Sequence, residues 1–355
     1  MHLLLRADSS PAIGAGHVMR CLALAQAWQD AGHDATFLSA TQTAMPRARL
    51  RQGSLPIRHM AADVGTEADA LQTVETARPL AAAWVVVDGY RFGTGYRRVI
   101  REAGLKVLAI DDIGFADSCE ADLVLNQNLH AHAGLYAPCG GGPELLLGTR
   151  YALLRREFTV HRGLRRDVPE VGRKLLVTLG GAGAEKATGT VMEALEQVHQ
   201  PRLRVRVVAP SSHDGLQPLV ERGKLSGHDV RLLGGASDMS KHMAWADAAV
   251  SGAGSTCWEL AYMGVPSLLV TMADNQRAVA DGLQDRRAAV RLGWHADVSP
   301  QAVADAVCRL LLDRHAREDM ILRGREIVDG AGGERVVAKL LANVEPPTAA
   351  PRGGE

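Results

Sequence analysis

Short apolar runs alternate with longer stretches of helical spacing along most of the 355 residues. Two of these runs, Val85-Val86-Val87 and Val107-Leu108-Ala109-Ile110, are continuously apolar, which is typical of strands covered on both faces. Such an alternation favours parallel sheets built from strand–helix–strand units. We therefore predict an α/β fold, and the length of the chain exceeds one comfortable hydrophobic core, so we expect two domains.

The pattern predicts where the elements lie. In the first half we expect strands at 3–7, 35–38, 57–60, 84–88, 106–110 and 123–126, and helices at 18–31, 67–77 and 95–103. Residues 131–145 are rich in Gly, Pro and His, so we expect a loop there. In the second half we expect strands at 175–179, 203–209, 230–233, 248–251 and 267–271, a helix ending near 198, and helices at 300–312, 318–328 and 334–344.

A basic segment with a proline, 162–170, separates the two sets of elements. We predict two doubly wound Rossmann-like domains, 1–165 and 166–344, with a cleft between them where open α/β sheets bind ligands. The last helices are candidates to pack back onto the first domain. The tail, 345–355, is rich in Pro, Ala and Gly, and we expect it to be disordered.

Charge and cysteine content exclude several classes of partner. Forty basic residues balance forty acidic ones, which argues against binding driven by charge to nucleic acid or to a membrane surface. The five cysteines are scattered without a C-x-x-C pair, which favours reduced thiols and speaks against a cysteine-rich zinc site. We expect no metal and no cofactor. The polar start of the chain and the lack of a long apolar run predict a cytoplasmic protein. The sequence has no obvious heptad pattern, so we expect a monomer.

A glycine-containing turn follows the first expected strand and leads into a helix, in the run Gly14-Ala15-Gly16-His17. Glycines let the backbone turn tightly and bring its N–H groups close to a ligand. His17 lies near the positive end of the helix, which disfavours the charged imidazolium and keeps the ring able to accept a proton. His17 is therefore a candidate general base, and the alternative is a histidine that only caps the helix.

Two more glycine turns follow expected strands in the second half. They are Gly180-Gly181-Ala182-Gly183 and Ser251-Gly252-Ala253-Gly254-Ser255-Thr256. Each stands between a strand and a helix, where backbone N–H groups bind anions. Neither has the spacing of a dinucleotide fingerprint or a Walker motif. Two such turns in one domain predict a diphosphate site, and the alternative for each is an ordinary tight turn.

Three further polar residues have two interpretations each. Glu259, one turn into the helix after Thr256, is suited to accept hydrogen bonds from both ribose hydroxyls, but Thr256-x-x-Glu259 is also a capping-box pattern. Asn275 follows a strand and is a candidate substrate contact or part of a helix cap. Tyr90 follows Asp88 at a strand end and is a substrate contact or a packed surface tyrosine.

With these residues assembled, the chain resembles the nucleotide-sugar hydrolase family of pseudaminic acid biosynthesis. The resemblance covers the chain from Arg6 to about residue 340, and the runs 13–21 and 251–259 carry it most specifically. It implies a GT-B-like fold, similar to UDP-sugar glycosyltransferases and to the enzyme that forms lipid II. It also implies hydrolysis of UDP-2,4-diacetamido-2,4,6-trideoxy-β-L-altropyranose to free sugar and UDP, in a pathway that serves flagellin glycosylation.

The resemblance implies roles for individual residues. His17 would be the base, with Gly14, Gly16, Arg20, Tyr90 and Asn275 near the sugar or the water. The second domain would hold UDP through Gly180, Gly181, Ala236, Met239, Gly252, Gly254, Ser255, Thr256 and Glu259, with Glu259 on the ribose and the backbone of 236–239 on the uracil. One departure concerns the run Gly180-Gly181-Ala182-Gly183-Ala184, which lacks the polar residue that the family often has there. At this turn, backbone N–H groups would then make the contacts to the phosphate without help from a side chain.

The expected reaction needs one base. UDP is a good leaving group because its charge spreads over a diphosphate, so helix N-termini stabilise it without the second carboxyl group that glycosidases use. We expect His17 to deprotonate a water that attacks the anomeric carbon with inversion. Two alternatives remain at this stage: a GT-B glycosyltransferase that moves the sugar to an acceptor, and a UDP-sugar binding protein without catalysis.

Overall fold

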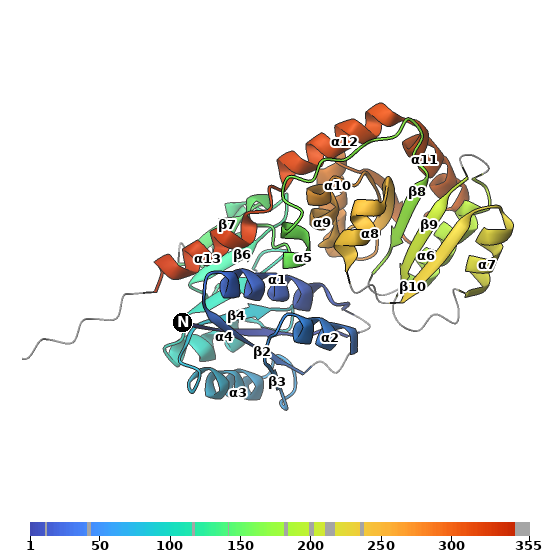
Figure 1. Cartoon of the computed structure of the whole chain (residues 1–355). Helices are drawn as coiled ribbons and strands as arrows, with labels where there is room; N and C mark the ends of the chain where they lie inside the picture. Colours follow the sequence, from blue (N-terminus) through green and yellow to red (C-terminus); the bar gives the residue numbers. More distant parts are fainter. Residues whose placement is uncertain are drawn as a thin grey trace, which may run out of the picture.

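A computed structural model of the chain describes residues 1–10, 13–40, 44–115, 118–140, 142–180, 184–198, 202–209, 217–234 and 238–344. Two parallel sheets form the centres of two α/β domains, which lie side by side (Figure 1). The expected disordered tail and two of the expected site residues, Gly181 and Ala236, lie outside the described residues.

The first sheet has the strand order β3-β2-β1-β4-β5-β6-β7, with all pairs parallel. Its strands are β1 (His2–Ala7), β2 (Asp34–Ser39), β3 (Ile57–His59), β4 (Ala82–Asp88), β5 (Val107–Ile110), β6 (Leu123–Asn126) and β7 (Glu144–Leu147). The helices of this domain are α1 (Gly16–Asp30), α2 (Ala44–Gln52), α3 (Glu67–Ala77) and α4 (Thr94–Glu102), with the 3-10 turns η1 (Ala133–Cys139) and η2 (Thr149–Tyr151). The strand order reverses between β1 and β4, which makes their carboxyl ends the switch point of this sheet.

The second sheet has the strand order β10-β9-β8-β11-β12-β13, again with parallel pairs. Its strands are β8 (Lys174–Thr178), β9 (Arg204–Ala209), β10 (Asp229–Gly234), β11 (Ala248–Gly252), β12 (Ser267–Thr271) and β13 (Val290–Trp294). The helices that follow in the chain are α5 (Arg156–Thr159), α6 (Ala184–Leu195), α7 (Gln217–Leu225), α8 (Met239–Trp245), α9 (Thr256–Met263), α10 (Arg277–Asp285), α11 (Pro300–Leu312), α12 (Arg314–Ile327) and α13 (Gly332–Ala342), with the turn η3 (Asp274–Gln276). The switch point of this sheet lies between β8 and β11.

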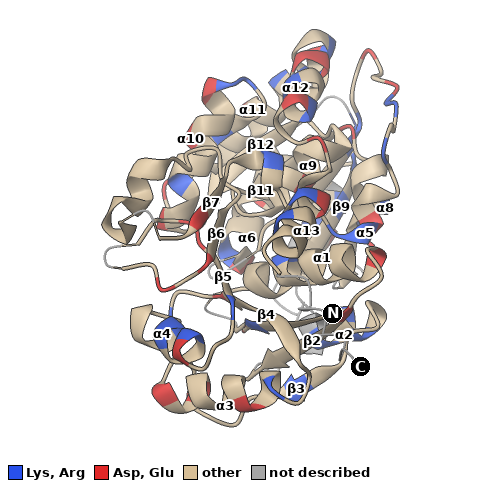
Figure 2. Ribbon diagram, turned by 90° about the vertical axis from the view of Figure 1, so that its left-hand side faces the viewer, with Lys and Arg blue, Asp and Glu red and all other residues tan. Residues whose placement is uncertain are grey.

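Local signals set several helix ends. Thr66 caps α3 by accepting a hydrogen bond from the N–H of Asp69, and Ser299 caps α11 in the same way before a proline at the first helical position. Gly264 ends α9 in the left-handed conformation, with φ of 62°, which a glycine adopts without strain. Acidic and basic residues are interspersed along α4 and α12 (Figure 2), which is typical of solvated helix faces.

The end of the chain returns to the first domain. Helix α12 runs along the second domain, and α13 lies against the first (Figure 1). Val336, Val337 and Leu340 of α13 are buried in the core around β1 and β4. The indole Nε1 of the fully buried Trp84 donates a hydrogen bond to the carbonyl of Leu340 at 3.1 Å. The C-terminal helix therefore ties the two domains together.

The structure corrects several expectations. The expected loop 131–145 contains the 3-10 turn η1 and the start of β7, because Leu146 is buried at the edge of the first core. Strand β13 was not expected, and α12 begins at Arg314 behind an Asp313 cap rather than at residue 318.

The cysteines also differ from the expectation of reduced thiols throughout. Cys119 and Cys139 form a disulfide, with Cα atoms 5.0 Å apart, and it joins the segment after β5 to η1. Cys21 and Cys257 are free thiols. The sequence did not predict this disulfide, because the two cysteines are 20 residues apart and come together only when η1 is folded.

Candidate active site

His17 lies at the switch point of the first sheet, as the second residue of α1. The turn that precedes α1 requires a glycine at position 14, where φ is 72° and the N–H donates to the carbonyl of Ser10 at 2.8 Å. The N-cap residue of α1, Ala15, makes no side-chain capping hydrogen bond, so among the described residues it leaves the first N–H groups of the helix uncapped. The imidazole is 7% exposed.

Asp88, at the carboxyl end of β4, holds the imidazole of His17. Its Oδ1 lies 2.7 Å from Nδ1 of His17, and its side chain is fully buried. A carboxylate only accepts hydrogen bonds, so in this contact Nδ1 carries a hydrogen, and in the neutral ring Nε2 then holds the lone pair. Nη2 of Arg20 also lies 3.2 Å from Nδ1. The ring also meets the ring of Tyr90 edge-on, with centroids 5.0 Å apart. Asp88 therefore fixes both the orientation and the tautomer that a general base needs.

Arg20 fixes Asp88 in turn. Its guanidinium donates to both oxygens of Asp88, at 2.6 and 2.7 Å, and to Oδ1 of Asp112 at 2.6 Å. Burial alone would raise the pKa of Asp88, but Arg20 and His17 hold that pKa below its ordinary value. We expected Arg20 near the sugar; in the structure it is buried between the carboxylates of Asp88 and Asp112, beside His17, and its contact with a sugar stays a prediction.

Asp112 extends this network to the other domain. Its Oδ2 accepts a hydrogen bond from the hydroxyl of Tyr90 at 3.0 Å, and Asn128 donates to its Oδ1 at 2.9 Å. Burial and the Asp112 carboxylate raise the pKa of Tyr90, so the phenol stays protonated. The side chain of Asn275, from η3 of the second domain, donates to the same Tyr90 hydroxyl at 2.8 Å. Tyr90 and Asn275 therefore meet where the two domains touch.

The second domain presents its own switch point to this region. Gly180 follows β8 and Gly252 ends β11, and a side chain on Gly252 would lie 3.9 Å from the backbone of Gly180. Ser255 is the N-cap residue of the eight-residue α9, and no side chain caps that helix. A side chain on Gly16 of α1 would lie 3.9 Å from the hydroxyl of Ser255. The uncapped N-termini of α1 and α9, one from each domain, thus face each other.

The structure contradicts one of the two alternatives left open for Glu259, the capping box, and the ribose contact stays a prediction. Ser255, and not Thr256, is the N-cap, so the residues of the expected capping box are out of register. The Oε1 atom of Glu259 instead accepts hydrogen bonds from Arg155, at 2.8 and 3.2 Å. Asn275 likewise caps no helix, because its side chain reaches Tyr90.

The remaining expected residue of the uracil segment, Met239, begins α8 and is buried in the core of the second domain. Sequence reasoning missed the support residues Asp88 and Asp112, the disulfide and Arg155. The signal for Asp88 and Asp112 was present, since each carboxylate stands at the carboxyl end of an apolar strand at this edge of the sheet.

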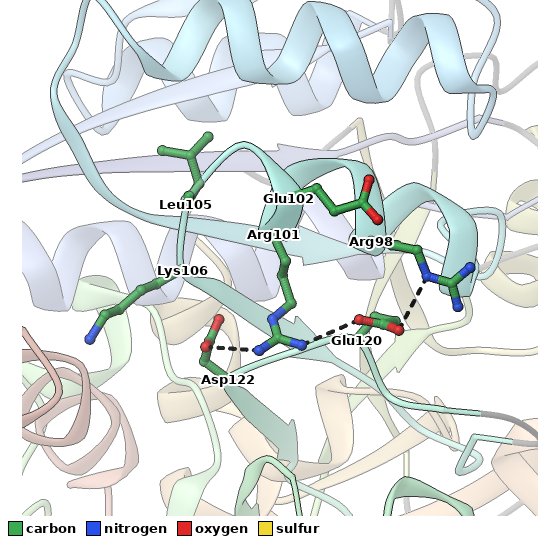
Figure 3. A pocket seen from close by; sticks show the side chains of 8 residues that line it. Arg98, Arg101, Glu102, Leu105, Lys106, Glu120 and Asp122 are labelled. Carbon is green, nitrogen blue, oxygen red and sulfur yellow. Dashed lines mark hydrogen bonds and ion pairs between the residues drawn. The ribbon is translucent and has the colours of Figure 1, made fainter.

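A hollow of about 430 Å³ lies at the amino-terminal end of β5, at the end of the first sheet opposite to His17 and Asp88 (Figure 3). Its acidic and basic groups pair with each other: Glu120 with Arg98 and Arg101 at 3.3 Å, and Asp122 with Arg101 at 3.6 Å. Ligands of open α/β sheets bind at the carboxyl ends of the strands, so this hollow is not the candidate site. No group of three or more His, Cys, Asp or Glu side chains within the described ranges is placed to hold a metal ion. Among the same residues, no helix has the length and apolar content to cross a bilayer.

Residues 174–329 match the family described as "Glycosyltransferase family 28 C-terminal domain". The spore coat polysaccharide biosynthesis protein SpsG of Bacillus subtilis is 28% identical over 200 residues, which is 56% of this chain and 57% of that protein. The UDP-2,4-diacetamido-2,4,6-trideoxy-beta-L-altropyranose hydrolase of Campylobacter jejuni is 25% identical over 288 residues, which is 80% of this chain and 96% of that protein. The chain thus spans little more than half of the Bacillus relative.

Solved structures show the same arrangement of two domains. MurG of Acinetobacter baumannii superposes with a TM-score of 0.67 and 18% identity, over 96% of this chain and all of that chain. The chain has the GT-B fold. MnaA of S. aureus, solved with UDP, has a TM-score of 0.69 at 12% identity, over 97% of each chain. At these identities the GT-B likeness concerns the fold alone.

The pKa of Asp112 provides a test of the buried network. Burial would raise it, but Arg20 and Asn128 hold it well below its ordinary value. Its charge therefore stabilises the fold at neutral pH, and this contribution is lost as the pH falls below the ordinary carboxyl range. Between about pH 7 and about pH 3, the wild type should lose about 1 kcal/mol more free energy of unfolding than Asp112→Asn, measured by urea denaturation.

The matched control is Asp274→Asn. Its carboxylate is 87% exposed and pairs with Arg277 on the surface, so this variant should follow the pH dependence of the wild type. If Asp112→Asn also followed the wild type, the Asp112 charge would not be held by Arg20 as described.

Proposed function

We propose that the chain hydrolyses a UDP-linked 2,4-diacetamido-2,4,6-trideoxy sugar to free sugar and UDP, within pseudaminic acid biosynthesis or a related diacetamido-sugar pathway. The observation that carries this proposal is the His17–Asp88 pair, placed where the N-terminus of α1 faces that of α9. The Campylobacter relative, similar over 80% of this chain, is named for this activity. The name of the Bacillus relative supports, as the related pathway, the synthesis of a spore-coat sugar.

The first domain would supply the base. With Nδ1–H donated to Asp88, Nε2 of His17 is free to take a proton from water. The buried Asp88 carboxylate then stabilises the imidazolium that forms, and Arg20 keeps that carboxylate charged. The activated water attacks the anomeric carbon from the face opposite UDP, so the configuration inverts. Tyr90 and Asn275 lie beside His17 and would contact the sugar or the water.

The second domain would hold the leaving group. The N-terminus of α9, Gly180 after β8 and the glycine turn after β11 would offer backbone N–H groups to a diphosphate. As the bond to the sugar breaks, the charge that develops on UDP is stabilised there, so no general acid is needed. The carboxylate of Glu259 would accept hydrogen bonds from the ribose hydroxyls, and the backbone near 236–239 would contact the uracil.

A second candidate function is transfer of the sugar to an acceptor other than water. The match of residues 174–329 to the C-terminal domain of a glycosyltransferase family favours it. The two reactions differ in what attacks the anomeric carbon, which the first domain decides.

Substitution of the base separates chemistry from binding. His17→Ala should lower kcat by about 10²–10⁴, because a positioned general base contributes that much. The nucleotide contacts lie on the other domain, so the Kd for UDP measured by calorimetry should change less than about twofold. A His17→Ala enzyme that turns over at close to the normal rate would remove His17 from the mechanism.

Hydrolysis itself is tested with purified protein, a UDP-linked 2,4-diacetamido-2,4,6-trideoxy sugar and no acceptor, in oxygen-18 water. We expect free sugar of inverted configuration by NMR, with the label in the sugar and none in UDP by mass spectrometry. Turnover only after an acceptor is added would favour the transferase. Label in UDP would show attack at phosphorus and overturn the mechanism.

A further inference from the structure

The segment that joins the domains is clamped between their two cores. Along residues 151–154, the side chains of Tyr151 and Leu153 are buried in the core of the first domain, and those of Ala152 and Leu154 in a core of the second. The next residue, Arg155, is only 7% exposed although it is charged. A charged side chain is buried at this junction only when it is well paired.

Arg155 is paired with carboxylates on both sides. Its Nε and Nη2 donate to Oε1 of Glu259 at 3.2 and 2.8 Å, and its Nη1 forms an ion pair with Glu157 at 2.7 Å. Its guanidinium also lies over the ring of Phe158, 5.0 Å from the centroid. Burial alone would lower the pKa of Arg155, but Glu259 and Glu157 raise it, so the group stays charged.

The pairing continues into the first domain. The other oxygen of Glu157 lies 3.3 Å from Nη1 of Arg49, on α2. An alternating chain of charges, Arg49–Glu157–Arg155–Glu259, therefore runs from α2 across the joining segment to α9. It connects the carboxylate proposed to bind ribose with the body of the other domain.

Arg155 engages only one oxygen of Glu259. Both hydrogen bonds go to Oε1, and Oε2 has no hydrogen-bond partner within the part of the chain that the structure describes. A glutamate side chain held at one oxygen has lost most of its rotamer freedom, a cost that a ligand would otherwise meet on binding. The second oxygen is then presented in a fixed direction to a donor.

We propose that Arg155 is a positioning residue for the nucleotide: it fixes the Glu259 carboxylate so that its free oxygen accepts a ribose hydroxyl, and it couples that contact to the orientation of the two domains. This inference rests on the proposed function in one respect, the assignment of Glu259 to the ribose. Arg155 need not touch the nucleotide itself.

The test compares the Kd values of UDP and 2′-deoxy-UDP by calorimetry for the wild type, Arg155→Ala, Arg155→Lys and Glu259→Gln. Wild type should prefer UDP by about tenfold or more, since a hydrogen bond to a charged group is lost with the hydroxyl. Arg155→Ala should reduce this preference to about threefold or less, with little change in the Kd for 2′-deoxy-UDP. Arg155→Lys should lie between them, because lysine keeps the charge without the fork.

Arg162→Ala is the matched control, because this arginine forms a surface pair with Glu334 and its side chain is 58% exposed. It should keep the wild-type preference. Arg155→Lys retains a buried cation and supplies the comparison if Arg155→Ala does not fold. If the Arg155 variants weaken both nucleotides equally and leave the preference intact, Arg155 acts on packing or phosphate and the proposal is overturned.

The Glu259→Gln variant distinguishes the role of Arg155 from the assignment of Glu259 to the ribose. Loss of the preference in this variant, together with its retention in Arg155→Ala, would overturn the role of Arg155 alone. Retention of the preference in Glu259→Gln would show that Glu259 is not the ribose acceptor, so that assignment in the proposed function would fail together with this inference.

Discussion

The contact between His17 and Asp88 is the interaction on which the rest of the site depends. A histidine at the start of a helix has a rotating side chain and two tautomers, and neither is useful to a reaction unless both are fixed. A fully buried carboxylate 2.7 Å from Nδ1 fixes both. That carboxylate is stable in the core only because Arg20 neutralises it and is itself shared with Asp112. The buried charges of Arg20, Asp88 and Asp112 together hold the imidazole of His17 in place.

The topology explains why these groups come together. In each doubly wound sheet the strand order reverses once, and the loops that leave the two central strands diverge there. His17 follows β1 and Asp88 ends β4, while Gly180 and Ser255 follow β8 and β11. The two switch points face each other because the joining segment and α13 fix one domain against the other. The candidate base and the glycine turns proposed to bind the diphosphate thus belong to different domains.

The strands and most helices of this fold are predictable from hydrophobic pattern alone, because parallel strands buried on both faces leave continuous apolar runs such as Val85–Val87. Strands β7 and β13 were missed. Both lie at sheet edges, where burial is partial and the run in β13 is broken by Arg291 and Gly293.

The site was predictable to the level of its turns and its histidine. The partners of His17 were not, because Asp88 lies 71 residues from His17 in sequence and approaches it only through the parallel pairing of β1 with β4. The resemblance placed Arg20 near the sugar, and its two carboxylate partners, Asp88 and Asp112, gave no signal because they lie 68 and 92 residues away in sequence. Arg155 had no signal, because its partner Glu259 lies 104 residues away in the other domain.

The protonation of the His17 ring tests this account most directly. Nitrogen-15 NMR of the imidazole at neutral pH, assigned by comparison with a His17 variant, reports which nitrogen carries the hydrogen. The account predicts a hydrogen on Nδ1 and a free lone pair on Nε2, and loss of this state in Asp88→Asn. A hydrogen on Nε2, or a spectrum unchanged by Asp88→Asn, would contradict it.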